Sequence, residues 1–305
     1  MENIIEVKNL KKYFKEVKAV DDISFQVEKG ELFGFLGVNG AGKTTVINML
    51  CTLYPKTEGT MKICGYDVSK EDKEVRKRIG VVYQNNCLDE KLTVKENLMI
   101  RGSMYELDSK KLKQQISSVC QVLSLEEVLH RPYAKLSGGQ KRKCEIARAL
   151  VNAPEVLFLD EPTTGLDPVT RKSVWKSIEL LRKELNMTVF LTTHYMEEAA
   201  RSSHIAIIDS GKLVKFGTPF SLKEQYAFDK LKLVPTEKEK CLNMLNDKKI
   251  AYKVREEFVV VNLTNTLQSL PILKELEPFI SGFEVVQGSM DDVFLNVTGK
   301  TLEQA

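Results

Sequence analysis

The sequence is poor in the residues that build metal sites and disulfide frameworks. Its 305 residues include only three histidines, and its six cysteines are scattered with no C-x-x-C spacing. Neither a zinc site nor a small disulfide-stapled fold is therefore expected. Unpaired cysteines are typical of a reducing, cytosolic setting.

An excess of one charge and a long apolar run are also missing. Lys and Arg number 45 against 42 Asp and Glu, and the net charge of +3 lacks the basic excess of a dedicated nucleic-acid binder. We therefore expect no nucleic-acid partner. The opening MENIIEVKNLKKYFKEV has no signal-peptide core, and no window reaches the roughly 18 uncharged apolar residues of a membrane span. If the chain works at a membrane, a separate subunit must supply the spans.

Short apolar runs that alternate with helical patterns dominate the first two thirds of the chain. The runs have strand length and lack polar alternation, as strands buried on both faces of a parallel sheet do. They are LFGFLG (32–37), VLFLD (156–160), TVFLTT (188–193) and IAIID (205–209). Helical spacing of apolar residues appears in CEIARALVNA (144–153) and TRKSVWKSIELLRKEL (170–185). This alternation predicts a layered α/β fold.

Two regions depart from that pattern. Residues 85–136 contain helix-like stretches without a convincing strand, which predicts an all-helical insert. After GTPF the pattern starts again, so we expect a first domain over 1–220 and a second over 221–305. The second has the order β-α-β-β-α-β of a ferredoxin-like α+β module, followed by the amphipathic piece SMDDVFLNVTG.

GVNGAGKTT, over residues 37–45, fits the phosphate-binding loop pattern G-x-x-x-x-G-K-[ST] and lies between a predicted strand and a predicted helix. The alternative is a turn that happens to be glycine-rich. Glycines let the backbone N–H groups converge on phosphate oxygens at a helix N-terminus. Lys43 would neutralise the β and γ phosphates, and Thr44 would supply a hydroxyl to Mg²⁺. The remaining nucleotide-binding candidates in the loop are Gly37, Asn39, Gly40, Ala41, Gly42 and Thr45.

A pair of carboxylates follows the buried strand VLFLD. Asp160 ends the strand where a metal-bound water would need a carboxylate, and Glu161 is free to orient or deprotonate a water facing the γ-phosphate. An acidic strand end is common by itself. Together with the glycine loop, it predicts a nucleotide hydrolase.

Four further stretches decide the class of phosphate-loop protein: Gln84 in VVYQNN, LSGGQ (136–140), GLDP (165–168) and His194 in LTTHYMEEA. With the glycine loop and the acidic strand, they resemble the ATP-binding cassette (ABC) family, whose motifs occur in this order. The resemblance covers about residues 4–220. It implies an ABC nucleotide-binding domain with a RecA-like core and an all-helical insert, and it implies ATP and Mg²⁺ as cofactors.

The resemblance also implies roles for these residues. Gln84 would touch Mg²⁺ or the attacking water and report the nucleotide state to the insert. Glu161, His194 and Gln84 would be catalytic, and Thr44, Gln84 and Asp160 would hold the metal. An aromatic residue, Phe14 or the adjacent Tyr13, would stack on the base. The remaining nucleotide contacts are implied for the signature and the D-loop, at Ser137, Gly138, Gly139, Gln140 and Asp167.

In the family, the signature of one subunit closes over the phosphate loop of the other. One cassette per chain therefore implies a homodimer with two equivalent sites. Two departures from the family pattern, Val38 in the loop and Ser203-His204 before the last core strand, supply no phosphate contact.

NNCLDEKLTVKENL and the ending SMDDVFLNVTG resemble the ATPase subunits of ABC-2-type, drug-resistance-like exporters. This implies a motor on the cytoplasmic face of the membrane, joined to a separate membrane permease. Two alternatives are a soluble ABC ATPase acting on nucleic acid or ribosomes and a regulatory subunit that binds nucleotide without turning it over. The first would usually show tandem cassettes, a coiled coil or a basic arm. The second predicts loss of Glu161 or His194, and both are present.

Overall fold

The computed structural model describes residues 2–105 and 108–299, and the chain divides into two compact units with the boundary after Gly217. The sequence placed this boundary three residues later, after residue 220. The difference arises because Thr218 caps helix α8 (Pro219–Tyr226), which packs on α11 (Met290–Thr298) inside the second unit. No helix in the described part of the chain is both long and apolar enough to cross a membrane.

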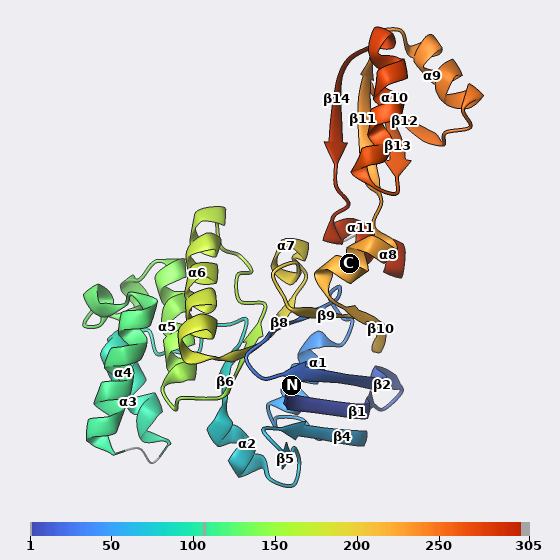
Figure 1. The fold of residues 1–305 in the computed structure, drawn as a ribbon. Helices are drawn as coiled ribbons and strands as arrows, with labels where there is room; N and C mark the ends of the chain where they lie inside the picture. The colour runs from blue at the N-terminus through green and yellow to red at the C-terminus, as the bar shows by residue number, and fades with distance from the viewer. Residues whose placement is uncertain (1, 106–107, 300–305) are drawn as a thin grey trace. The chain divides into compact units, whose positions relative to one another are not determined.

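A six-stranded sheet forms the centre of the first unit (Figure 1). Its order is β10-β9-β3-β8-β7-β6, and all neighbours are parallel except the β9-β10 hairpin. The strands are β3 (Leu32–Leu36), β6 (Ile79–Val82), β7 (Val156–Asp160), β8 (Thr188–Thr193), β9 (His204–Asp209) and β10 (Lys212–Gly217). The four predicted strands are therefore confirmed, and β6 and β10 are additions to them. Every residue of β3, β7 and β8 is buried, as strands covered on both faces require.

A second, antiparallel sheet of the first unit was not predicted. Its order is β2-β1-β4-β5, and its strands are β1 (Asn3–Phe14), β2 (Val17–Glu28), β4 (Glu58–Ile63) and β5 (Tyr66–Asp67). The missed signal is the alternation along β2, where Ile23, Phe25 and Val27 are buried between exposed neighbours. Phe25 packs on Phe33 with ring centroids 5.5 Å apart, so aromatic rings join the two sheets.

Seven helices complete the described part of the first unit: α1 (Lys43–Leu50), α2 (Asp72–Arg78), α3 (Val94–Ser103), α4 (Ser109–Leu123), α5 (Gly138–Leu150), α6 (Pro168–Leu185) and α7 (Met196–Ala199). Residues 85–136 contain helices and, among their described residues, no strand longer than the isolated bridge from Thr93 to Pro132. The predicted helical insert is thus confirmed. Buried apolar side chains of α3 and α4 form one core with α5, α6 and the sheet.

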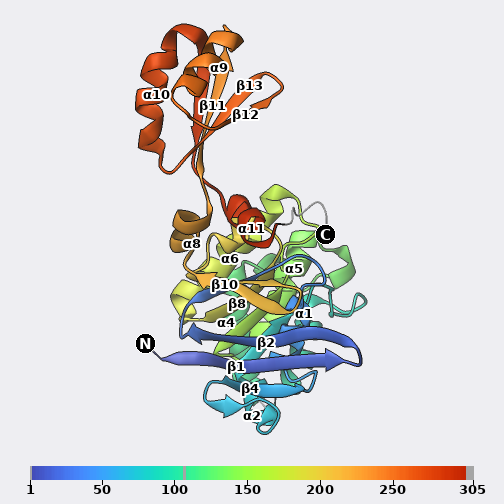
Figure 2. The same cartoon turned by 90° about the vertical axis from the view of Figure 1, so that its right-hand side faces the viewer.

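The second unit contains every element that its pattern predicted. These are β11 (Asp229–Pro235), α9 (Lys238–Asp247), β12 (Tyr252–Arg255), β13 (Phe258–Leu263), α10 (Ser269–Leu276), β14 (Ile280–Val286) and the terminal helix α11. The strands form an antiparallel sheet in the order β12-β13-β11-β14. Helices α9 and α10 flank this sheet (Figure 2), and their apolar side chains share its core with Leu231, Val259 and Val261.

Candidate functional site

The glycine loop joins β3 to α1, as the motif predicted. Gly42 caps α1 with φ of 109°, and a Cβ there would lie 2.5 Å from the carbonyl oxygen of Ala19. A Cβ on Gly37 would lie 2.6 Å from the carbonyl oxygen of Ile208. Glycine is therefore required at both positions. No side chain caps α1, so its first N–H groups are available to an anion, which the helix dipole also favours.

Lys43 is buried at the first position of α1, with 4% of its side chain exposed. Its Nζ donates to the carbonyl oxygens of Gly37 (2.7 Å) and Val38 (3.1 Å) and lies 3.5 Å from Glu161 Oε1. Burial lowers the pKa of the Lys43 ammonium, and the charges of Glu161 and Asp160 oppose that shift. Lys43 thus stabilises the glycine loop through two carbonyl oxygens. A phosphate could take the place of Glu161 as its anionic neighbour.

The carboxylates of Asp160 and Glu161 have different partners, although the two residues are adjacent. Asp160 ends β7 and accepts a hydrogen bond from Thr192 Oγ1 at 2.5 Å. Burial raises the pKa of its carboxyl group, against the hydrogen bond from Thr192. Glu161 leaves the strand with φ of 45°, a left-handed backbone that costs a non-glycine residue about 1–2 kcal/mol. This turn directs its carboxylate away from Asp160 and toward the glycine loop.

Three predicted residues meet at the carboxylate of Glu161. Gln84 Nε2 donates to Glu161 Oε2 at 3.4 Å, and Lys43 approaches the other oxygen. His194 Nδ1 lies 3.3 Å from Oε2 but outside hydrogen-bond geometry, so this buried nitrogen has no hydrogen-bond partner. Thr164, which the sequence did not single out, donates its hydroxyl to the same oxygen at 3.2 Å. These side chains come from loops far apart in the chain, and the fold brings them together.

A cavity of about 730 Å³ lies over this cluster, within the size range of ligand pockets. The predicted residues that line it are Asn39, Gly40, Gly42, Lys43, Thr44, Thr45, Gln84, Glu161 and His194. Asp160 and Ala41 are buried and do not line it. Val17, Lys18 and Ala19 form another wall; they belong to the antiparallel sheet that sequence reasoning missed.

The two aromatic candidates for base stacking do not line this cavity. Tyr13 donates its hydroxyl to Asp21 at 2.7 Å, and Phe14 is 42% exposed with its ring edge-on to Tyr54. The ring of Phe14 is therefore partly accessible, while the Tyr13 side chain is held by its hydrogen bond to Asp21.

The signature residues lie outside the cavity as well. Ser137 caps α5 in a capping box with Gln140, whose side-chain oxygen accepts from the Ser137 N–H at 3.1 Å. A Cβ on Gly139 would lie 2.5 Å from Thr170 Cγ2 of α6. Asp167 caps α6 by accepting from the N–H groups of Val169 and Thr170, both at 3.0 Å. The structure thus places the signature beside the D-loop at the start of two helices, and not with the phosphate loop of the same chain.

Helix α5 also carries a buried arginine that sequence reasoning missed. Arg142 is 5% exposed and donates to the carbonyl oxygen of Tyr83 (2.6 Å), which directly precedes Gln84, and to that of Pro162. It also reaches the carbonyl oxygens of Asp160 and Glu161, both at 3.3 Å. One side chain therefore ties the glutamine loop to the loop of the catalytic candidate.

Glu145, one turn further along α5, supports the far side of the glutamine loop. Its carboxylate accepts from the N–H groups of Cys87 (2.6 Å) and Leu88 (2.9 Å), and from Arg148 Nε at 2.8 Å. Arg148 in turn donates to the carbonyl oxygen of Val81 on β6. Helix α5, which starts at the signature, thus holds the backbone on both sides of Gln84.

A family model described as "ABC transporter" matches residues 20–164. The chain is 33% identical over 306 residues to the Nod factor export ATP-binding protein I of Cupriavidus metallidurans, covering 99% of each. It is 33% identical over 308 residues to the daunorubicin resistance ATP-binding protein DrrA2 of Streptomyces coeruleorubidus, covering 96% of this chain and 94% of that one.

Among solved structures, the chain resembles the dimeric post-hydrolysis state of the ATP-binding cassette MJ0796 bound to ADP and Pi. The TM-score is 0.63 at 26% identity, over 70% of this chain and 98% of that one. It also resembles the ADP conformation of the ATP-binding cassette MJ1267, with a TM-score of 0.66 at 25% identity over 72% of this chain and 92% of that one.

Proposed function

The chain belongs to the ABC transporter family of ATP-binding proteins and is an ATPase of that family, and from this premise we propose that it is the motor subunit of an exporter. The observation that carries the proposal is the convergence of Lys43, Gln84 and His194 on the carboxylate of Glu161 beside a cavity of nucleotide size. Relatives that match nearly the whole chain, the accessory unit included, are named for the export of Nod factor and for daunorubicin resistance.

In the proposed mechanism, Glu161 is the general base. Its left-handed backbone and the hydrogen bonds from Gln84 and Thr164 hold the carboxylate at the mouth of the phosphate loop. There it can take the proton of a water aligned with the γ-phosphate. Lys43 would leave Glu161 for the β and γ phosphates, which frees the carboxylate. The unpartnered Nδ1 of His194 is a free hydrogen-bonding group on the same side of the cavity.

We propose that Mg²⁺ would be held by oxygen donors in and behind the wall of the cavity, since Thr44 and Gln84 line it and Asp160 is buried next to Glu161. The proposed donors are the Thr44 hydroxyl, the Gln84 amide oxygen and the buried carboxylate of Asp160, which matches the preference of Mg²⁺ for few protein ligands plus phosphates and waters. When bound, Mg²⁺ would neutralise phosphate charge. Thr192 orients the Asp160 carboxylate through its hydroxyl. For the base, we propose Phe14 as the stacking ring, since the residue is 42% exposed and Lys12 Nζ lies 4.7 Å from its ring centroid, so that one ring face at most is covered by this cation.

We propose further that two chains form a head-to-tail homodimer around two ATP molecules. The signature residues are turned to the surface beside Asp167 and do not line the cavity of their own chain. Ser137, Gly138, Gly139 and Gln140 would therefore complete the site of the partner. The likeness to a dimeric ABC cassette supports this arrangement.

The membrane subunit is proposed to dock beside the glutamine loop. A cavity of about 430 Å³ there is lined by Cys87, Leu88, Ile100 and Met104, among others. Ile100 is 50% exposed and Met104 is 64% exposed, which is typical of an apolar contact surface. Because Glu145 holds Cys87 and Leu88, movement of a docked helix would reach Gln84 directly. The chain would thus work on the cytoplasmic face of the membrane, attached through this permease.

Co-purification tests the docking surface. Affinity-tagged chains are recovered from detergent-solubilised membranes of the source cell, and the recovered membrane protein is quantified. The double variant Ile100→Glu/Met104→Glu should lose that protein while keeping ATP hydrolysis by the purified chain. Leu185→Glu, an exposed apolar residue at the end of α6, is the matched control and should retain it. Equal recovery with all three chains would contradict the proposed docking surface.

For the C-terminal unit we propose a ferredoxin-like module. The antiparallel order β12-β13-β11-β14 and the helices α9 and α10 in the two crossovers support this assignment. Its proposed role is contact between cassettes or with a regulator.

A further inference from the structure

One face of the C-terminal sheet is open, because helices α9 and α10 cover only the other. Side chains alternate along β11, so Leu231 and Leu233 enter the core shared with the two helices. Lys230, which precedes Leu231, and Lys232, which lies between the two leucines, therefore point to the open face. Phe258, Val260 and Asn262 of β13 emerge there for the same reason.

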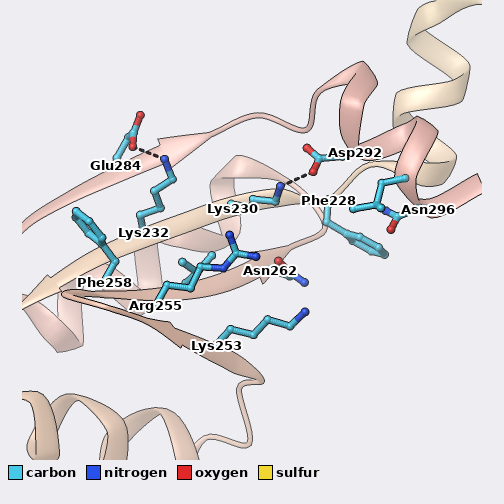
Figure 3. A pocket seen from close by; sticks show the side chains of 12 residues that line it. Phe228, Lys230, Lys232, Lys253, Arg255, Phe258, Asn262, Glu284, Asp292 and Asn296 are labelled. Carbon is cyan, nitrogen blue, oxygen red and sulfur yellow. Dashed lines mark hydrogen bonds and ion pairs between the residues drawn. The ribbon is translucent and has the colours of Figure 1, made fainter. Parts of the chain in front are cut away.

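A cavity of about 470 Å³ lies on this open face. Its floor is formed by the strands, and α11 supplies a wall with Asp292, Leu295 and Asn296 (Figure 3). Hydrogen bonds fix that wall: Asn296 Nδ2 donates to the carbonyl oxygen of Tyr226 at 2.7 Å, and Lys230 pairs with Asp292. The cavity is therefore a built feature of the second unit and shares no residue with the ATP site.

The cavity is cationic. Four of its lining residues are basic (Lys230, Lys232, Lys253 and Arg255), and two are acidic. Both acids are already taken, since Asp292 pairs with Lys230 and Glu284 with Lys232. Within residues 2–105 and 108–299, Lys253 and Arg255 have no carboxylate partner. Two neighbouring cations on one strand repel each other unless an anion lies between or beside them.

The strand register places Lys232 and Lys253 on either side of a gap that is wide enough for a small anion. Val260 pairs with Lys232 on one side and with Lys253 on the other. These two lysines are therefore separated by two strand spacings, about 9.5 Å, with an apolar residue between them. Figure 3 shows Arg255 and Asn262 beside this gap. Because Lys232 is already paired with Glu284, a phosphate group in this space would take its unpaired cationic donors from Lys253 and Arg255.

Two exposed aromatic rings complete the lining. Phe228, directly before β11, is 48% exposed, and Phe258 is 42% exposed. Large apolar rings next to paired and unpaired cations suit a ligand that is planar at one end and anionic at the other. A charged surface that contacts only water would gain nothing from exposing two aromatic rings.

We propose that this cavity binds a nucleoside phosphate, which makes it a second nucleotide site that lies outside the cassette. Lys253 and Arg255 bind the phosphate, Phe228 stacks on the base, and Asn262 offers an amide to the base or sugar. The volume is within the range of small-ligand sites. Such a ligand would report a nucleotide level to the motor through a unit that contributes no residue to the lining of the ATP site.

The test measures binding of AMP to the full chain by equilibrium dialysis, in a Lys43→Ala background that disables the phosphate loop of the cassette. Saturable binding of one AMP per chain is expected. The double change Lys253→Glu/Arg255→Glu should weaken it by at least about 10-fold, because a hydrogen bond to a charged group contributes that much or more. Lys238→Glu, on α9 at the covered face, is the matched control and should leave the affinity unchanged.

The ring is tested separately with Phe228→Ala. Base stacking on an aromatic ring contributes about 1–3 kcal/mol, so AMP affinity should fall by roughly 5- to 150-fold. Affinity for pyrophosphate, which has no ring, should not change. Phe220→Ala removes an exposed ring outside the cavity and should have no effect.

Absence of saturable AMP binding, or equal binding by the charge-reversed chain, would overturn the proposal. Binding of a single-stranded oligonucleotide or an acidic peptide in place of AMP would overturn it too. All chains are compared by circular dichroism melting, so that loss of binding is not loss of folding. Because the readout is binding in a chain with a disabled cassette, its outcome is independent of the proposed transport function.

Discussion

Arg142 provides the sharpest test of how the site is held together. The perturbation is Arg142→Met, which keeps much of the side-chain volume and removes every donor. It leaves the carbonyl oxygens of Tyr83 and Pro162 without their short hydrogen bonds. A buried acceptor left unsatisfied costs about 1–3 kcal/mol, so the pair costs about 2–6 kcal/mol. Part is offset because a buried cation is removed as well; burial already lowers its pKa. We expect a net loss of about 2–4 kcal/mol in unfolding free energy.

Turnover should fall for a separate reason. Arg142 sets the spacing between the glutamine loop and the loop of Glu161, and a displacement of about 1 Å in a catalytic group can cost about 100-fold in rate. We therefore expect kcat to fall by about 10- to 100-fold. ATP affinity should be retained, because Arg142 does not line the cavity. Arg142→Lys, with a single ammonium in place of the forked guanidinium, should be intermediate.

Urea unfolding and steady-state ATPase kinetics measure the two effects, with kinetics taken well below the melting temperature. Lys143→Met is the matched control, since it removes a positive charge from the next position of α5, where the charge that acts on the side chain is that of Lys176 on α6. A chain carrying Arg142→Met whose stability and kcat match those of the Lys143→Met chain would refute the positioning role.

Four further predictions follow from the same geometry. Glu161→Gln should keep ATP binding, lose about 10²- to 10⁴-fold in turnover and accumulate as an ATP-bound dimer in size-exclusion chromatography; turnover within a few-fold of the parent would exclude a general-base role. Mixing chains that carry Lys43→Ala with chains that carry Ser137→Arg places both lesions in one composite site, so activity should recover in part, and no recovery in proven mixed dimers would count against the head-to-tail arrangement. Burial raises the pKa of Asp160, so the folded state binds its proton more tightly than the unfolded chain does, and the stability from this group is present at low pH and lost as pH rises through the folded pKa. Asp160→Asn should therefore raise the melting temperature of the nucleotide-free protein at neutral pH, and calorimetry should show the gain shrinking toward the ordinary pKa of 3.8; a constant gain at all pH values would contradict the assignment. A chain that ends at Gly217 should still bind ATP, since the phosphate ligands precede it, but should lose ATPase activity more steeply on dilution if the second unit helps to hold the dimer, and superimposable dilution curves would remove that role.

The sequence alone was sufficient to predict those parts of the fold and of the site that depend on residues close together in the chain. The glycine loop predicted its own strand, turn and helix, because the backbone conformations that glycine permits are local. Asp160 and Glu161 were found because a buried strand ends there. The order of elements in the C-terminal unit followed from its alternating pattern, and each element lies where the pattern placed it.

Only the tertiary structure decided the contacts between distant segments. Arg142 meets Tyr83 across 59 residues, and Gln84 meets Glu161 across 77. No local pattern distinguishes Arg142 from the half-buried basic residues on either side of it, since its burial depends on how α5 packs against the ends of two strands. The wall formed by Val17, Lys18 and Ala19 depends in the same way on the packing of one sheet against another. The open cationic face of the second unit depends on which side of its sheet two helices cover. A strand pattern gives two faces, and only the packing of other elements determines which of them remains exposed.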